Sequence, residues 1–363
     1  MTGPTNSDLS IDDLTIVELL IPASLDSPAS PGTAAFIEMT EVRNTIEADV
    51  VGSRDLAYTP AELLPSWHNE DEQRRLFVAR SGGRILARST YEVQSGTDIP
   101  SAWLSVEVLP EFRRRGIGSA VHRELVGIAA DEGRAVLQVF ATHGDAPGDR
   151  ITAPTGFGSI AARDPGAAFL VSNGYRLAQV ERMSRLPLPR TVPVPGPPAG
   201  YGLEMWEGPT PVHRRNDLAV LHAAMSTDPP LGETDWQPEP WDAARVVRQD
   251  ALNDAEGRRW LTAAARHVAS DTLVGFTQLT VPADTVPAND MRPIFQQDTV
   301  VLGAHRGHRL GHLIKAANLA TLTGLPNPCI YTWNAEENRH MLAVNEALGF
   351  VAVGYTGSWR REV

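Results

Sequence analysis

WLSVEVLPEFRRRGIGSAVHREL, residues 103–125, joins a strand pattern to a helical pattern through a turn rich in arginine and glycine. Apolar and polar residues alternate before Pro110, which is typical of a half-buried strand. After Gly118 the apolar residues recur at helical spacing. The first turn of a helix has unpaired N–H groups and the positive end of the helix dipole. This junction therefore predicts a binding site for an anion such as pyrophosphate.

The same order of patterns recurs in QDTVVLGAHRGHRLGHLIKAANL, residues 297–319. In each copy an apolar strand follows, and then a helix that ends in a glycine and an aromatic residue. Short glycine motifs often match by chance, but a match at corresponding places in two copies is much less common. The sequence therefore predicts an internal duplication. Its matched positions are Arg113 and Arg306, Gly118 and Gly311, and Gly174 and Gly349.

A proline-rich stretch, LPLPRTVPVPGPPAG at residues 186–200, separates the two copies. Closely spaced prolines lack backbone donors and favour an extended, semi-rigid path. We therefore predict a first domain at residues 1–186, a linker at 187–200 and a second domain at 201–363. The order of the patterns predicts an α/β (α+β) fold in each domain, with a mixed, mostly antiparallel sheet flanked by helices.

The composition excludes several classes of function. The formal net charge of −12 argues against a nucleic-acid partner, because binding to phosphates draws on basic residues. Cys329 is the only cysteine, which excludes an internal disulfide and a multi-cysteine metal site. Residues 1–11 lack the pattern of a secretion signal, and no apolar run is long enough to span a membrane. We expect a cytoplasmic monomer or homodimer without a membrane partner or a bound metal.

Arg113-Arg114-Arg115-Gly116-Ile117-Gly118 resembles the Q/R-x-x-G-x-G/A signature of the GNAT superfamily of N-acetyltransferases. The two-copy layout is similar to that of tandem members such as mycothiol synthase. The resemblance implies that acetyl-CoA, or another short acyl-CoA, binds with its pyrophosphate on the turn and its pantetheine arm along the preceding strand. The cofactor-binding residues that it implies are Val106, Val108, Arg113, Arg114, Arg115, Gly116, Ile117, Gly118 and Ser119 in the first copy, and Thr299, Val301, Arg306, Gly307, His308, Arg309, Leu310, Gly311, His312, Asn334 and Asn338 in the second.

The chain departs from the family pattern at two places. Arg309 stands where the signature has its middle glycine, although Gly307 is close by, and we expect binding to survive. The tyrosine that often protonates the leaving thiolate in this family is replaced by Leu170 in the first copy and by Asn345 in the second. Asn345 can donate a hydrogen bond, but it is a poor acid.

Acyl transfer to an amine also needs a base that removes a proton from the amine. The family's usual positions for this base hold no basic or acidic residue in either copy, so the nearest candidates are Glu107 and Asp298. Either residue could instead be an ordinary polar strand residue. Together with Asn345, these two acids form the candidate catalytic set.

The sequence therefore predicts an enzyme that transfers an acetyl group to a primary amine of a small molecule by direct attack, with the second domain favoured as the active one. The alternative is a non-catalytic or regulatory tandem module that binds acyl-CoA, because the usual acid and base are missing. A dinucleotide oxidoreductase is disfavoured, because the chain lacks the required glycine pattern at its first strand-to-helix turn.

Overall fold

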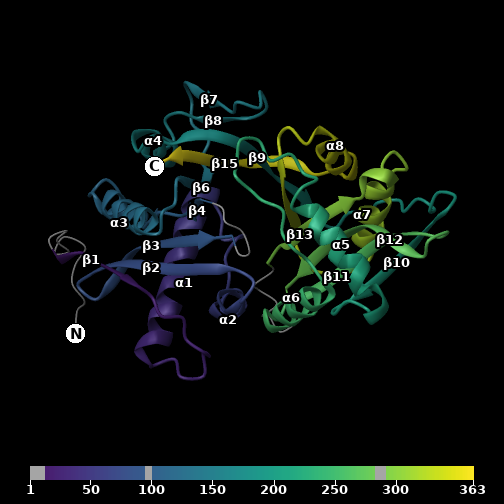
Figure 1. Cartoon of the computed structure of the whole chain (residues 1–363), viewed down its shortest axis with the longest axis horizontal. Coiled ribbons are helices and arrows are strands. Elements are labelled where there is room, and N and C mark those ends of the chain that lie inside the picture. Colours follow the sequence, from purple (N-terminus) through teal and green to yellow (C-terminus); the bar gives the residue numbers. More distant parts are fainter. Residues whose placement is uncertain (1–12, 95–99, 283–291) are drawn as a thin grey trace. The chain divides into compact units, whose positions relative to one another are not determined.

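The computed structural model describes residues 13–94, 100–282 and 292–363, so the expectation about residues 1–11 lies outside the described part. The chain forms two compact units, whose elements are labelled in Figure 1. Unit 1 contains the described residues up to Thr152, together with Ser159–Ala178 and Thr356–Val363. Unit 2 contains Ala153–Gly158 and Gln179–Tyr355.

Unit 1 is a mixed sheet covered by helices. Its strands lie in the order β1 (Thr15–Glu18), β2 (Gln73–Ser81), β3 (Arg84–Val93), β4 (Ser101–Leu104), β6 (Val136–His143) and the end of β15 (Val351–Glu362). The two-residue strand β5 (Glu107–Val108) follows β4 and also pairs with β3. The main helices are α1 (Pro31–Val51), α3 (Ile117–Asp131) and α4 (Pro165–Ser172). The short elements are α2 (Pro60–Leu63) and the hairpin of β7 (Arg150–Thr152) and β8 (Ser159–Ala161).

Unit 2 repeats this order of elements, as the duplication predicts. Its strands lie in the order β9 (Arg176–Pro187), β14 (Cys329–Ala335), β13 (Ile294–Val301), β12 (Thr272–Val281), β11 (Arg259–His267) and β10 (Tyr201–Glu207). Its helices are α5 (Arg215–Met225), α6 (Ala243–Ala255), α7 (Leu310–Ala320) and α8 (Arg339–Leu348). In both units the strand before the turn runs parallel to the strand after the turn helix, β4 with β6 and β13 with β14.

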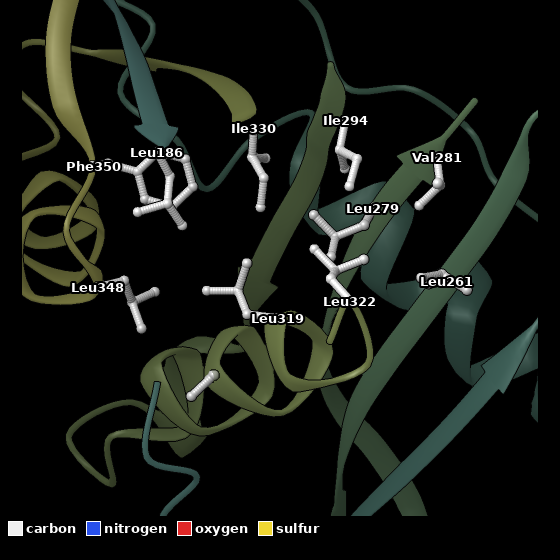
Figure 2. Packing of buried hydrophobic residues seen from close by; sticks show 11 residues of the cluster. Leu186, Leu261, Leu279, Val281, Ile294, Leu319, Leu322, Ile330, Leu348 and Phe350 are labelled. Atoms are coloured by element: carbon white, nitrogen blue, oxygen red, sulfur yellow. The ribbon is translucent and has the colours of Figure 1, made fainter. Parts of the chain in front are cut away.

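The core of unit 2 lies on both faces of its sheet. Because side chains alternate along a strand, Ala264 packs on the α5 face, with Leu218 and Val300, while Ala263 packs on the α7 face, with Leu313. Figure 2 shows a further cluster, in which Leu319 of α7 and Leu322 of the following turn lie beneath the strands. Any side chain on β13 or β14 can therefore be assigned to one of two faces.

Each unit is completed by a strand from the other half of the sequence. The end of β15 belongs to unit 1, where the backbone N–H of Val363 donates to the carbonyl of Ala135 over 2.9 Å. The part of β9 from Gln179 onward belongs to unit 2 and pairs with β14, with Ser184 opposite Thr332. The compact units therefore differ from the sequential division that the proline-rich stretch predicts, because strand pairing joins segments far apart in sequence.

A buried side-chain network holds this last strand in unit 1. The indole Nε1 of Trp359 donates to Nε2 of His143 over 2.9 Å, and Nδ1 of His143 lies 2.7 Å from Oδ1 of Asp164. Since the carboxylate accepts and the indole donates, the neutral imidazole carries its proton on Nδ1. The same hydrogen bond, with two backbone N–H groups, lowers the pKa of Asp164 despite its burial. All the donors and acceptors of His143 are thus used in holding the strand.

Candidate functional site

The strand before each turn separates from its parallel neighbour. In unit 1, pairing between β4 and β6 ends at Leu104 and Val139. In unit 2, pairing between β13 and β14 ends at Phe295 and Tyr331. Beyond these points both strands of each pair continue without pairing to one another in the described chain. Their backbone groups there can hydrogen-bond to a ligand that lies between them.

In unit 2, β13 also contains a β-bulge on its side facing β12. Thr277 of β12 pairs with Thr299, whereas Leu279 pairs with Gln296, so two residues of β13 stand opposite one residue of β12. One of the two is Asp298. Bulges bend a strand and redirect side chains, and they are frequent beside functional sites. At the corresponding place in unit 1, Oγ of Ser105 accepts the backbone N–H of Thr90 of β3 over 2.9 Å.

Each turn has two residues in the left-handed region, one arginine and one glycine, and their order differs between the two turns. In unit 1, Arg114 has φ of 61° and Gly116 has φ of 83°. In unit 2 the order is reversed, with φ of 85° at Gly307 and 57° at Arg309. Arg309 thus adopts the left-handed backbone conformation of Gly116, the glycine at the matching position of unit 1. The turn of unit 2 therefore keeps this conformation although the family signature has a glycine there. Each turn keeps one non-glycine residue in the left-handed region, at a cost of about 1 to 2 kcal/mol.

The first arginine of each turn fixes the turn to its own strand. Arg113 donates from Nε to the carbonyl of Val108 over 3.0 Å and forms an ion pair with Asp49 at 2.6 Å. Arg306 donates to the carbonyl of Val301 over 3.0 Å and forms an ion pair with Asp228 at 2.6 Å. Both side chains are therefore engaged in contacts within the chain, which leaves the exposed Arg114, Arg115 and Arg309 and the backbone N–H groups of the turns to face an anion.

Neither turn helix has a side-chain cap at its start. α3 begins after Gly116 and α7 after Arg309, and no side chain of the preceding residue accepts from the first turn. The first helical residues, Ile117 and Leu310, are buried anchors, while the turn residues before them are exposed. A Cβ added at Gly311 would meet no atom within 4 Å. Exposed, uncapped N–H groups with open space before them fit a pyrophosphate.

The remaining predicted cofactor residues lie around these turns. In unit 1 the side chains of Val106 and Val108 face Gly118, and Ser119 is exposed. In unit 2 the hydroxyl of Thr299 lies 2.8 Å from that of Thr277. The other members are His308, whose ring lies 5.1 Å from that of Tyr201, and His312, which is partly exposed on the first turn of α7.

Asp298 lies beside a buried histidine on the α5 face of unit 2. Its Oδ2 is 3.8 Å from Nδ1 of His222, and the imidazole stacks on Trp241 with ring centroids 4.3 Å apart. A separation of 3.8 Å is too long for a hydrogen bond, so the two groups are neighbours rather than a bonded pair. Within the described chain, no arginine or lysine pairs with Asp298.

Burial sets the protonation of both groups. Burial, and then the charge of Glu239, raise the pKa of Asp298 to about 6. Burial, and then the charge of Arg245, lower the pKa of His222 to about 4. The Asp298 side chain is still 46% exposed, so the carboxylate is reachable from solvent although protein surrounds it. A reachable carboxylate with a pKa near neutrality is suited to remove a proton.

Glu107, the candidate base of unit 1, lies in a different environment. Its carboxylate is 3.6 Å from Nε of Arg88, whose side chain is only 8% exposed. Glu47 lies in the same cluster, and burial raises its pKa, as does the charge of Glu107 to a smaller extent. Arg88 gives Glu107 a structural role as the counter-ion of a buried guanidinium.

On the α7 face of unit 2, three polar side chains form a chain of hydrogen bonds. Nζ of Lys315 donates to Oδ1 of Asn345 over 2.9 Å, and Nδ2 of Asn345 donates to Oδ1 of Asn334 over 2.6 Å. Asn338 is not part of this chain, because its side chain accepts the backbone N–H of Met341 and caps α8. The structure therefore brings together Asn334 and Asn345 and gives Asn338 a capping role.

The sequence analysis missed His222, Trp241 and the role of Lys315. Lys315 carried a signal, because it is the only lysine of the chain and lies within the apolar run LIKAANLA. His222 and Trp241 carried none, since their importance comes from their distance to Asp298. In the part of the chain that the structure describes, no group of three or more potential ligands could hold a metal ion. No described helix is both long and apolar enough to cross a membrane.

Comparisons with known proteins agree with this architecture. Residues 40–147 match the model of the Acetyltransferase (GNAT) family, while no curated protein matches the sequence. A tandem GNAT protein from the clavulanic acid biosynthesis pathway is 24% identical with a TM-score of 0.72, and the match covers 96% of this chain and 98% of that one. A GCN5-related N-acetyltransferase from Sphaerobacter thermophilus is 15% identical with a TM-score of 0.63, and the match covers 99% and 97%. Residues 40–147 are thus a GNAT-family segment, in a chain whose whole fold is that of tandem GNAT proteins.

Proposed function

We propose that this chain is an acyl-CoA-dependent N-acetyltransferase that acts on a primary amine of a small molecule, and that unit 2 carries the reaction. The observation that carries this proposal is the position of Asp298. It lies on a bulged strand, past the point where β13 separates from β14, and β13 leads directly into an uncapped phosphate-binding turn. A base, unpaired strand edges and an anion site thus follow one another along one segment.

The turns supply the binding site for the donor. The exposed N–H groups at the starts of α3 and α7 would hold the pyrophosphate, and the unpaired backbone beyond Val106 or Thr299 would hold the pantetheine arm. The donor would supply an acetyl group activated as a thioester. Fixing that group between two separated strands orients it toward an amine, which is a large part of what such a site has to achieve.

Asp298 would prepare the amine. An amine is mostly protonated at neutral pH and cannot attack until it loses a proton. With a pKa of about 6, Asp298 is mostly ionised at pH 7 and can accept that proton. The neighbouring His222 is neutral at this pH, so it does not compete by holding the carboxylate in an ion pair.

Carboxylates on the same face of the sheet favour a cationic acceptor. Glu181 of β9 pairs in register with Ala335, which places it on the face of β14 that Trp333 also occupies. Burial, and then the charge of Glu337, raise the pKa of Glu181 to about 7. Crowded, partly desolvated carboxylates are stabilised by a bound cation. The net charge of −12 points the same way.

A second function fits unit 1 better, namely binding of acyl-CoA without transfer. Its turn has the same left-handed pair as that of unit 2. However, Ser105 occupies the position of Asp298, Leu170 that of Asn345, and Phe140 that of Asn334. Unit 1 would then bind a donor molecule for structural or regulatory purposes.

Calorimetric titration of acetyl-CoA into the wild type, Gly116→Glu and Gly311→Glu tests the proposal. We expect two sites in the wild type, each lost with its own substitution, because a carboxylate placed at the helix start repels phosphate. We also expect that Gly311→Glu abolishes turnover with an amine panel while Gly116→Glu does not. If the wild type binds no acetyl-CoA, the chain is not an acyl-CoA-dependent enzyme.

A further inference from the structure

A buried lysine with no counter-ion among the described residues is hard to explain by stability alone. Lys315 is 1% exposed and lies on α7, among apolar side chains. Burial lowers its pKa to about 7, and no charged neighbour contributes to that shift. Among the described residues, Nζ donates to Asn345 and lies 5.8 Å from the centroid of the Phe350 ring. Such a group costs folding free energy that a methionine of similar size would not.

The lysine has a definite effect on the two asparagines. Nζ of Lys315 donates to the side-chain oxygen of Asn345, so the NH2 of Asn345 is turned away from the lysine. That NH2 then donates to the oxygen of Asn334. Because the oxygen of Asn334 accepts this hydrogen bond, the NH2 of Asn334 is turned away from Asn345. Within the described chain, this NH2 has no protein partner. One buried amine therefore sets the orientation of two amides.

The outer end of this chain lies at the proposed site. Asn334 is on β14, three residues past Tyr331, where pairing with β13 ends. It is partly exposed, whereas Asn345 and Lys315 are buried. By strand alternation Asn334 shares the α7 face with Ile330, so it lies on the face opposite Asp298.

We propose that Lys315 is a positioning residue that holds Asn345 and Asn334 in one orientation, so that Asn334 presents N–H donors between the separated strands of unit 2. This role rests on the proposed acyl transfer. There the donors would stabilise negative charge that develops on the thioester oxygen or on the leaving sulfur. Asn334 would touch the reacting group, and Lys315 acts only through the two amides.

Unit 1 provides the matched control. His122 of α3 aligns with Lys315, and its Nε2 lies 3.1 Å from the hydroxyl of Tyr175. Leu170 stands at the position of Asn345, and its apolar side chain cannot continue a chain of hydrogen bonds. A substitution at His122 therefore changes a buried polar residue at the position that matches Lys315, without affecting the hydrogen bonds of Asn345 and Asn334.

The experiment compares Lys315→Met, Asn345→Leu, the double variant and His122→Met, with an amine that the wild type acetylates. We expect kcat to fall about 10-fold to 100-fold in Lys315→Met, with little change in KM for acetyl-CoA and no loss of thermal stability. Asn345→Leu should lower kcat as much, and the double variant no further, because the residues act as one unit. Lys315→Gln should recover part of the activity, since its amide can donate to Asn345. His122→Met should leave kcat unchanged.

A wild-type kcat in Lys315→Met or in Asn345→Leu would overturn the proposal, as would additive losses in the double variant. A second measurement does not depend on activity. Because Lys315 is the only lysine, labelling lysine with 15N at Nζ gives a single nuclear magnetic resonance signal. We expect Asn345→Leu to shift this signal and His122→Met not to. If the wild type binds no acetyl-CoA but the shift occurs, the proposed function fails and the orienting chain stands. If the shift is absent, the chain fails whatever the enzyme does.

Discussion

At matched places around the two turns, units 1 and 2 carry different side chains. Unit 1 has Ser105 and Leu170 where unit 2 has Asp298 and Asn345, although both turns keep the same backbone conformation. The family model, however, matches residues 40–147, which lie in unit 1. The unit with the more recognisable sequence is therefore the one with fewer groups able to do chemistry. A turn that resembles the family signature is evidence for phosphate binding only. Evidence for a reaction has to come from other residues, such as those at the positions of Asp298 and Asn345.

The largest expected difference between the units concerns the base. Asp298→Asn removes the proton acceptor, and we expect kcat/KM at pH 7 to fall by about 10²-fold to 10⁴-fold. In the wild type, kcat/KM should rise with pH through about 6, because only the ionised carboxylate accepts a proton, and this limb should vanish in the variant. Steady-state kinetics between pH 5 and 9 measure both.

Glu107→Gln is the control in unit 1, and it should leave kcat/KM unchanged. An equal loss of activity in Glu107→Gln and Asp298→Asn would mean that both units react, or that neither acid is the base.

The next difference is in the dependence of stability on pH. In the folded chain the pKa of Lys315 is about 7, against 10.5 for an exposed lysine. Between these values the unfolded chain holds a proton that the folded chain lacks, so wild-type stability rises with pH across this range. Lys315→Met should therefore be more stable than the wild type below pH 7, and the advantage should shrink toward pH 10.5. It is bounded by about 1.4 kcal/mol per pKa unit.

Replacing the buried His122 of unit 1 should also raise stability relative to the wild type, but in a different pH range. Burial, and then the charge of Arg361, lower its pKa to about 4. His122→Met should gain stability over the wild type only as the pH falls from about 6.5 toward 4. Urea unfolding of both variants across pH 4 to 10 measures the two windows. Overlapping windows would contradict the assignment of a different buried group to each unit.

A smaller effect is expected from the network that holds the last strand. Trp359→Phe leaves Nε2 of the buried His143 without a donor, which should cost about 1 to 3 kcal/mol. Trp67→Phe in the same unit is the control, because the indole nitrogen of Trp67 is buried with no hydrogen-bond partner in the structure. Thermal unfolding should separate the two variants. Equal losses would show that packing, rather than the hydrogen bond to His143, holds the strand.

The smallest effects concern the exchanged residues of the turns. Gly116→Ala places a Cβ at φ of 83° and should cost about 1 kcal/mol, although the space around it is open. Arg309→Gly relieves the same strain but adds freedom to the unfolded chain, so the net change should stay within about 0.5 kcal/mol. Thermal unfolding checks both. A large loss in Arg309→Gly would mean that its side chain makes contacts that stabilise the turn.

The features that the sequence predicted are local ones. The turns, the helices after them and the duplication depend on residues close in the chain, such as Gly116 and Gly118, whose spacing is visible in one dimension. Asp298 and its neighbour His222 are 76 residues apart in the sequence, and Lys315 and its hydrogen-bond partner Asn345 are 30 apart, so spacing carries no information about either contact. The capping role of Asn338 could have been predicted, because asparagine before a helical run favours this position.

The sequence could not predict that β15 ends in unit 1 or that most of β9 belongs to unit 2, since the residues of a strand do not specify which strand it pairs with. Ser184 would suit either half by composition, and only the folded chain shows that it stands opposite Thr332. The predicted domain boundary at the linker therefore describes where the sequence repeats, whereas the compact units describe which segments pack together.

The exchange of final strands has a consequence for synthesis on the ribosome. Thr356–Val363 complete unit 1, yet they are translated after all the other residues of both units. While the second half of the chain is translated, unit 1 lacks this strand, and the edge of its sheet at β6 stays exposed. Exposed sheet edges promote association with other chains. Expression of residues 1–186 alone would leave that edge uncovered permanently. Deleting the codons of Thr356–Val363 would therefore damage unit 1, although most of that unit is encoded before residue 179.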